Sequence, residues 1–150
     1  MCFRNFYSKD RTVVYMNSIT IEAVIKNIPQ LTDTIDEFLE SLDCPLKIQM
    51  QIDVAMDEIV TNVAMYAYGD STGPVTMEYD KIENKNGIVL VFKDNGMPFN
   101  PLTHEDPDTS LSAEARKIGG LGIFMVKNSM DELSYEYTDN TNIFTVKKYF

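Results

Sequence analysis

The sequence has few cysteine and histidine residues, which form the disulfides of small extracellular proteins or bind structural metals. Its 150 residues include two cysteines, Cys2 and Cys44, a single histidine and no tryptophan. Two cysteines without metal-ligand spacing indicate reduced thiols rather than a disulfide framework or a zinc site. The first residues also lack the apolar stretch of a secretory signal. We therefore expect a cytoplasmic protein.

Basic residues and long apolar runs are scarce as well. Lys and Arg total 13 against 23 Asp and Glu, which gives a net charge of −10. This balance disfavours direct contact with nucleic acid, because binding to phosphates depends on clustered Lys and Arg. No apolar run approaches the ~20 residues of a membrane span, so we expect no membrane association. The length and the hydrophobic content of 44% suit a single domain, residues 1–150, with one core.

The segment 46–67 carries the clearest helical pattern. Its apolar residues recur at steps of three and four, which predicts one buried stripe made of Ile48, Ile52, Ala55, Ile59 and Val63. Glu58 and Asn62 are four residues apart, so their side chains should lie on one face of the helix beside this stripe. Such a pair is, by itself, typical of a solvated helix face. At the margin of a core, the same carboxylate and carboxamide can serve one ligand.

The apolar pattern elsewhere predicts further elements in a definite order. These are a strand (12–19), a helical turn capped by Thr20, a helix (29–43), the central helix, strands at 75–79 and 88–92, a helix opened by Gly120 and a closing hairpin (133–146). The strand at 88–92 is apolar on both faces, which favours a central position in a sheet. We therefore expect an α+β fold. Its architecture should be a two-layer α/β sandwich, with helices on one face of a mixed, mostly antiparallel sheet.

Two stretches lack a periodic pattern. Residues 1–11 are polar and aromatic and should form a loose lead-in. Residues 97–118 contain Pro98, Pro101 and Pro107, with a short helical possibility near their end. We interpret them as a lid-like loop, and a passive surface connection is the alternative, since loops of this length are usually functional or disordered.

Two glycine-containing segments follow the central helix. Asp94-Asn95-Gly96 comes directly after the central strand, and Gly119-Gly120-Leu121-Gly122 precedes the last helix. The first could be an ordinary turn and the second a flexible connection. However, small residues at a helix N-terminus also let backbone N–H groups approach phosphates. In the helix that follows, we expect a buried side made of Leu121, Phe124, Met125 and Met130.

The order of these motifs resembles the Bergerat ATP-binding fold of DNA gyrase, a heat-shock chaperone, the histidine kinases and a mismatch-repair ATPase. The closer resemblance is to the anti-sigma-factor serine/threonine kinases. Residues 94–101 follow their extended pattern Asp-x-Gly-x-x-Phe-Asp-Pro, with Asn100 in place of the second Asp, and residues 123–133 are similar to the same branch. The resemblance covers roughly residues 12–150.

The resemblance implies a role for each motif residue, with ATP or ADP and Mg²⁺ as cofactors. It makes Glu58 the general base, gives Asn62 an oxygen ligand to Mg²⁺, and lets Asp94 accept a hydrogen bond from the adenine amino group. Tyr66 stands where the branch commonly has a histidine, so we expect it near the nucleotide. Glycine at position 96 should leave room for the base. The residues expected around the phosphates are Gly119, Gly120, Leu121 and Gly122.

By the same resemblance, the protein is a serine/threonine kinase that phosphorylates an anti-anti-sigma antagonist, with a sigma factor as a possible second partner. An alternative is a binding module that sequesters a sigma factor or another regulator and uses nucleotide only to gate affinity. A third, the ATPase part of a two-component sensor, is disfavoured because no phosphoacceptor helix accompanies His104. Homologous kinases form dimers, so a homodimer is expected. We find no exposed apolar stripe in the sequence to assign to its interface.

Overall fold

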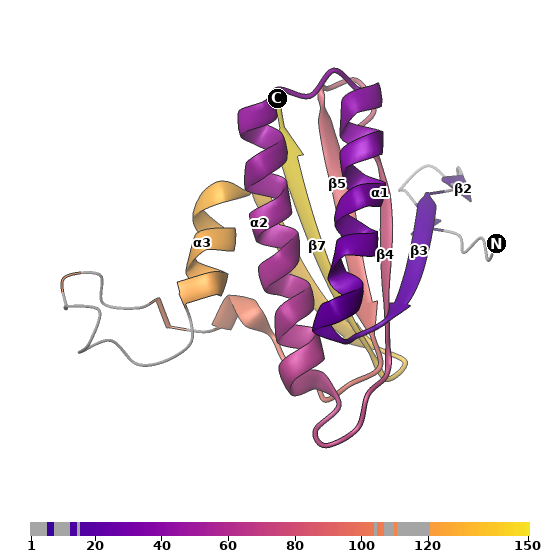
Figure 1. The fold of residues 1–150 in the computed structure, drawn as a ribbon, viewed down its shortest axis with the longest axis vertical. Coiled ribbons are helices and arrows are strands. Elements are labelled where there is room, and N and C mark those ends of the chain that lie inside the picture. The colour runs from indigo at the N-terminus through magenta and orange to yellow at the C-terminus, as the bar shows by residue number, and fades with distance from the viewer. Residues whose placement is uncertain (1–5, 8–12, 15, 104, 107–109, 111–120) are drawn as a thin grey trace.

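The computed structural model describes residues 6–7, 13–14, 16–103, 105–106, 110 and 121–150. Three helices and the five strands of the main sheet follow one another in the predicted order (Figure 1). The helices are α1 (Ile28–Ser41), α2 (Leu46–Asn62) and α3 (Leu121–Ser129). The strands are β3 (Asn17–Glu22), β4 (Pro74–Lys81), β5 (Gly87–Asp94), β6 (Glu132–Thr138) and β7 (Thr141–Tyr149). Short turns of 3-10 helix occupy Ile25–Asn27 and Pro101–Thr103.

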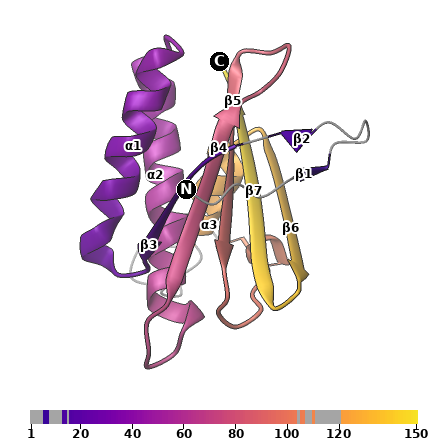
Figure 2. The same ribbon diagram turned by 90° about the vertical axis from the view of Figure 1, so that its right-hand side faces the viewer.

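The five strands form one sheet in the order β3-β4-β5-β7-β6, so the apolar strand β5 is central, as predicted. The helices lie on one face of this sheet (Figure 2), which confirms the two-layer α+β architecture. Every pairing among the described strands is antiparallel, so the parallel pairing implied by a mixed sheet is absent from them.

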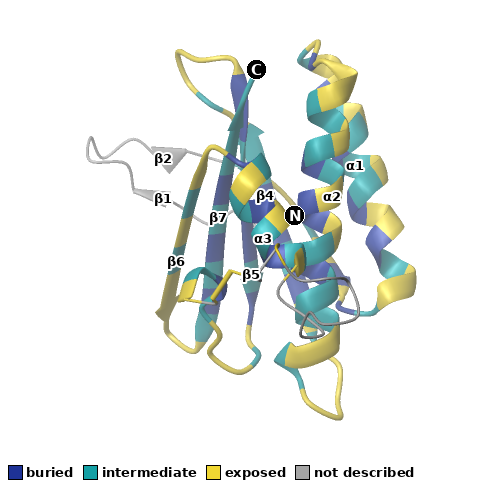
Figure 3. Cartoon of the chain, turned by 90° about the vertical axis from the view of Figure 1, so that its left-hand side faces the viewer, coloured by how far each residue is buried: buried dark blue, intermediate teal, exposed yellow. Residues whose placement is uncertain are grey.

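The core lies between the helices and the sheet (Figure 3). The predicted stripe of the central helix faces it: three members are buried and two, Ile48 and Val63, are half-buried. The helix continues past Asn62 as a π-helical turn, Val63–Ala67, so the predicted helical segment 46–67 is confirmed. Among the described residues, no helix has both the length and the apolar character needed to cross a membrane.

The N-terminal part differs from the prediction. Thr20 lies inside strand β3 rather than capping a helix, and its hydroxyl shares a hydrogen bond of 2.7 Å with that of Thr76 on β4. Two short strands, β1 (Phe6–Tyr7) and β2 (Val13–Val14), pair with each other. The loose lead-in expected for residues 1–11 therefore contains β1, and its remaining residues lie outside the described part.

Helix α3 buries a different side from the one we predicted, although Met130, which directly follows the helix, is buried as expected. Ile123, Val126 and Met130 are buried, at steps of three and four, whereas Leu121 and Met125 are 44% and 43% exposed. The helix has two apolar stripes in its sequence, one with Leu121 and Met125 and one with Ile123 and Val126. The second stripe is buried in the fold, and it continues to Met130.

Candidate functional site

A cavity of about 170 Å³ opens beside the C-terminal half of α2. Three of the predicted site residues, Asn62, Tyr66 and Asp94, line it together although they come from three different elements. Its other lining residues are mainly apolar: Ile59, Val63, Ala67, Phe92, Met97, Pro98, Phe99, Pro101, Ile123, Tyr135, Asn142 and Phe144. An apolar concave surface with a few convergent polar groups is the usual character of a small-molecule site.

Asp94 is the last residue of the central strand and is only 8% exposed. Its Oδ1 accepts hydrogen bonds of 2.9 Å from the Gly96 N–H and from Asn142 Nδ2. From the described residues, no hydrogen bond reaches its other oxygen, Oδ2. An ionised carboxylate only accepts hydrogen bonds, so Oδ2 is available to a ligand that presents a donor.

Asn142, on β7, connects the walls of the cavity and was not predicted from the sequence. It lies opposite Asp94 in the strand register and is 5% exposed. Its Nδ2 also donates to the Met97 carbonyl (3.0 Å), while its Oδ1 accepts from the Phe99 N–H (3.1 Å) and the Tyr135 hydroxyl (2.7 Å). Burial raises the pKa of Tyr135, so this hydroxyl stays a donor at neutral pH. Asn142 thus connects the end of β5 at Asp94, the segment 97–99 that follows it, and Tyr135 on β6.

The turn after Asp94 is fixed against the end of the central helix. A Cβ atom on Gly96 would lie 2.7 Å from the Ala67 carbonyl carbon, and the Met97 N–H donates to the Ala67 carbonyl oxygen at 2.8 Å. The hydroxyl of Tyr68 accepts from the Asn95 N–H (3.1 Å) and donates to a backbone carbonyl on β4. The space left at Gly96 is therefore filled by Ala67, and Gly96 is not among the residues that line the cavity.

Glu58 lies outside the cavity lining, next to the start of α3. Its carboxylate contacts Gly122 so closely that a Cβ atom there would lie 2.7 Å from the carboxyl carbon. Glu58 is half-buried and sits one turn of α2 before Asn62. Of the predicted glycine-rich segment, Leu121 and Gly122 open α3, and Gly119 and Gly120 lie outside the described residues.

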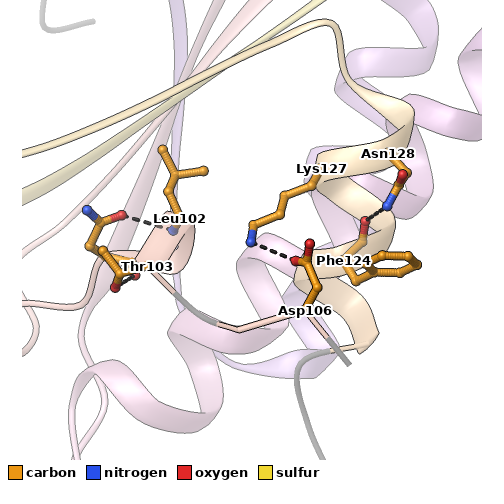
Figure 4. A network of polar contacts seen from close by, with 7 residues as sticks. Leu102, Thr103, Asp106, Phe124, Lys127 and Asn128 are labelled. Atoms are coloured by element: carbon orange, nitrogen blue, oxygen red, sulfur yellow. Dashed lines mark hydrogen bonds and ion pairs between the residues drawn. The ribbon is translucent and has the colours of Figure 1, made fainter. Parts of the chain in front are cut away.

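The segment between β5 and α3 is described up to residue 106, apart from residue 104. Asn100 Oδ1 accepts the Leu102 N–H at 2.9 Å, which starts the 3-10 turn there. Lys127 of α3 forms an ion pair of 2.8 Å with Asp106 (Figure 4), so this segment contacts α3 at its outer side. The predicted lid spans residues 97–118. Most of these residues, namely 104, 107–109 and 111–118, lie outside the described part of the chain.

The fold, a helical layer over one antiparallel sheet, and the cavity beside α2 can be compared with those of known proteins. A family model described as the histidine kinase-like ATPase domain matches residues 21–148, and the chain belongs to this family. Among the described residues, no three His, Cys, Asp or Glu side chains are grouped to hold a metal ion.

Curated relatives carry the name serine-protein kinase RsbW. The protein from Listeria monocytogenes (strain EGD-e) is 30% identical over 99 residues, 63% of this chain and 62% of its own length. The protein from Bacillus mycoides is 24% identical over 98 residues, 63% of this chain and 60% of its own. The match thus spans less than two thirds of each relative.

A solved structure of the RsbU and RsbW domains of Rv1364c from Mycobacterium tuberculosis is also similar. Its TM-score is 0.60 at 13% identity, and the match covers 91% of this chain and 33% of that one. At this identity, the likeness establishes the fold alone.

Proposed function

We propose that this protein binds ATP·Mg²⁺ beside Asp94 and transfers the γ-phosphoryl group to a serine or threonine of an anti-anti-sigma antagonist. In this role it would also hold a sigma factor, and it would act as a cytoplasmic homodimer. The observation that carries the proposal is the position of the Glu58 carboxylate against Gly122. One helical turn further along α2, Asn62 lines the same cavity as Asp94.

The cavity suits an adenine base. Its apolar walls include Phe92, Ile123 and Phe144, and the one carboxylate among its lining residues has an oxygen free of protein donors in the described part. The exocyclic amino group of adenine is a donor, so it complements Asp94 Oδ2. Tyr66, which lines the cavity and is 63% exposed, would cover the outer side of the base.

The opposite end of the site suits the phosphates. Asn62 would offer its side-chain oxygen to Mg²⁺, which usually takes only one or two ligands from protein. When bound, the ion supplies charge neutralisation at the phosphoryl oxygens. The first N–H groups of α3, at Leu121 and Gly122, together with those of Gly119 and Gly120, would offer hydrogen bonds to the anion, which is the usual function of a helix N-terminus.

Glu58 is then the general base. It would accept the proton of the acceptor hydroxyl while the hydroxyl oxygen bonds to the γ-phosphorus. The bond from that phosphorus to the bridging oxygen breaks, and ADP leaves. Its half-buried side chain can meet an acceptor that approaches from outside the cavity.

A pull-down from the native cytoplasm, with and without ATP·Mg²⁺, followed by phosphosite mapping, tests this function. We expect one retained partner to gain a phosphorylated serine or threonine when ATP is present. If ATP changes retention but no partner is phosphorylated, the protein is instead a nucleotide-gated module that sequesters a sigma factor or another regulator.

A further inference from the structure

The outer face of α2 carries an apolar stripe that we did not find in the sequence. Leu46, Met50 and Val54 are 70%, 61% and 42% exposed, and each follows the previous one by four residues. Side chains at this spacing stack along one face of a helix. The stripe points away from the core, which the helix contacts through Ile52 and Ile59.

Helix α3, which packs beside α2, carries two further exposed apolar residues. Leu121 and Met125 are 44% and 43% exposed and are also four residues apart. The two helices pack side by side (Figures 1 and 3), with Gly122 of α3 against Glu58 of α2. Large apolar side chains grouped on a surface mark contact sites, unlike those exposed singly. We call these residues the α2–α3 apolar surface: Leu46, Met50, Val54, Leu121 and Met125.

Acidic residues are concentrated in α1, α2 and the turn between them. Residues 28–62 contain eight Asp or Glu and one basic residue, Lys47, and so carry most of the net charge of −10. Asp53 of α2 is close to Asp36 of α1: burial first, and then the charge of Asp36, raises the pKa of Asp53 to about 6. Among the described residues, Asp53 Oδ1 is buried without a hydrogen-bond partner. Asp53 as a whole is half-buried, so its charge can still attract a cationic side chain at the surface.

We propose that the α2–α3 apolar surface binds a basic amphipathic helix of a partner protein. The apolar face of that helix would cover Met50 and its neighbours, and its Lys or Arg side chains would pair with Asp36 and Asp53. A second copy of this chain is a poorer occupant, because it carries the same net charge of −10 and the same acidic pair, Asp36 and Asp53. Anionic lipid is disfavoured for the same reason.

The proposal is independent of the kinase function. None of the five residues of the α2–α3 apolar surface lines the cavity that contains Asp94, and Leu121 contributes to the proposed phosphate site only through its backbone N–H. A protein that bound no nucleotide could still bind a helix here. Evidence against the kinase function would therefore leave the helix-binding proposal standing, and the reverse also holds.

Two synthetic helical peptides of about 18 residues, long enough to form a helix on binding, provide the probe. They share one leucine face, and their polar positions carry lysine in the first peptide and glutamate in the second. We expect calorimetry to detect binding of the lysine peptide only. Met50→Ser should weaken it about tenfold or more, as truncation of a central apolar contact does. Ile25→Ser is the matched control, because Ile25 is 57% exposed but lies before α1.

The contribution of the acidic pair, Asp36 and Asp53, is tested in the same assay. Asp53→Asn should weaken binding of the lysine peptide, and Glu136→Gln, at an exposed position of β6, should not. In the wild type, affinity should fall between pH 7 and pH 5, as Asp53 takes up a proton and loses its attraction for lysine. The groups that interact with Asp53 are Asp36 of α1 and the Cys44 thiol before α2.

Three results would overturn the proposal. Equal binding to Met50→Ser and Ile25→Ser would place the site elsewhere, and equal binding of the glutamate peptide would remove the role of charge. Sedimentation that shows a wild-type dimer and a Met50→Ser monomer would make a second copy of this chain the occupant.

Discussion

Asn142 Nδ2 donates a 2.9 Å hydrogen bond to Asp94 Oδ1 across the paired strands β5 and β7. Both side chains are buried, so neither exchanges this bond with bulk water. The carboxylate is thereby fixed by one oxygen, and its other oxygen stays open to the cavity. Adenine selectivity should therefore depend on the pair rather than on Asp94 alone.

Replacement of Asn142 by alanine should lower both stability and the preference for ATP over GTP. The change removes the acceptor of the Tyr135 hydroxyl and a donor to Asp94. Loss of such hydrogen bonds in a buried site costs about 1–3 kcal/mol each. Urea unfolding and competition binding with ATP and GTP measure the two effects. Tyr135→Phe is the control: it removes one hydrogen bond but leaves Asp94 paired, so the nucleotide preference should stay.

Asp94→Ala should reduce the ATP:GTP preference more strongly than Asn142→Ala, since a site that loses its buried acceptor discriminates poorly. The same competition assay compares both variants. An unchanged preference in Asp94→Ala would make Asp94 a turn residue that only holds Gly96 and Asn142.

Much of this site could be predicted because its residues belong to local patterns. Asp94 ends an apolar strand, and Asn62 follows Glu58 by one helical turn. The turn at Gly96 and the order of the elements along the chain also follow from short-range signals. Local periodicity and turn chemistry predicted these elements, whereas the grouping of their residues into one site was implied by the resemblance to the Bergerat fold.

The features that we missed depend on which faces meet in three dimensions. Asn142 looks like a polar loop residue until the antiparallel register places it opposite Asp94. Leu46, Met50 and Val54 extend the apolar content of α2, but only the packing against α1, α3 and the sheet leaves them outside. The same competition between two apolar stripes explains the wrong buried side of α3.

Asn62→Ala should weaken ATP binding much more with Mg²⁺ than with a chelator. The variant loses a metal ligand oxygen but no adenine contact, because Asp94 is unchanged. Calorimetry under both conditions measures the difference, and equal losses would assign Asn62 to packing of the cavity wall.

Gly122→Ala should separate stability from phosphoryl transfer. Alanine favours a helix over glycine by up to about 1 kcal/mol, and the φ of Gly122 lies outside the left-handed region, so α3 should not weaken. The new Cβ would displace the Glu58 carboxylate, and transfer should therefore slow. Thermal unfolding and single-turnover assays test the two effects. A Gly122→Ala variant that transfers the phosphoryl group at the wild-type rate would show that transfer does not require Glu58 in this position.

Asp53→Asn should stabilise the protein at pH 7 and have little effect near pH 4. Burial and Asp36 raise the folded-state pKa of Asp53 from 3.8 to about 6, so the folded state loses stability as pH rises through this window. Because Asp53 is only partly buried, solvent screening reduces the effect to about 1 kcal/mol. Urea unfolding at both pH values compares the variant with the wild type. A constant difference between them would contradict the raised pKa.

The role of Glu58 as general base is tested most directly by single-turnover transfer from labelled ATP to the antagonist recovered in the pull-down. Wild type should transfer the phosphoryl group. Glu58→Gln, which keeps the shape of the side chain against Gly122 but cannot accept a proton, should bind ATP within a few-fold. Its transfer rate should be ~10²–10⁴ lower, the usual contribution of a general base. Transfer that continues at the wild-type rate in Glu58→Gln would contradict this role.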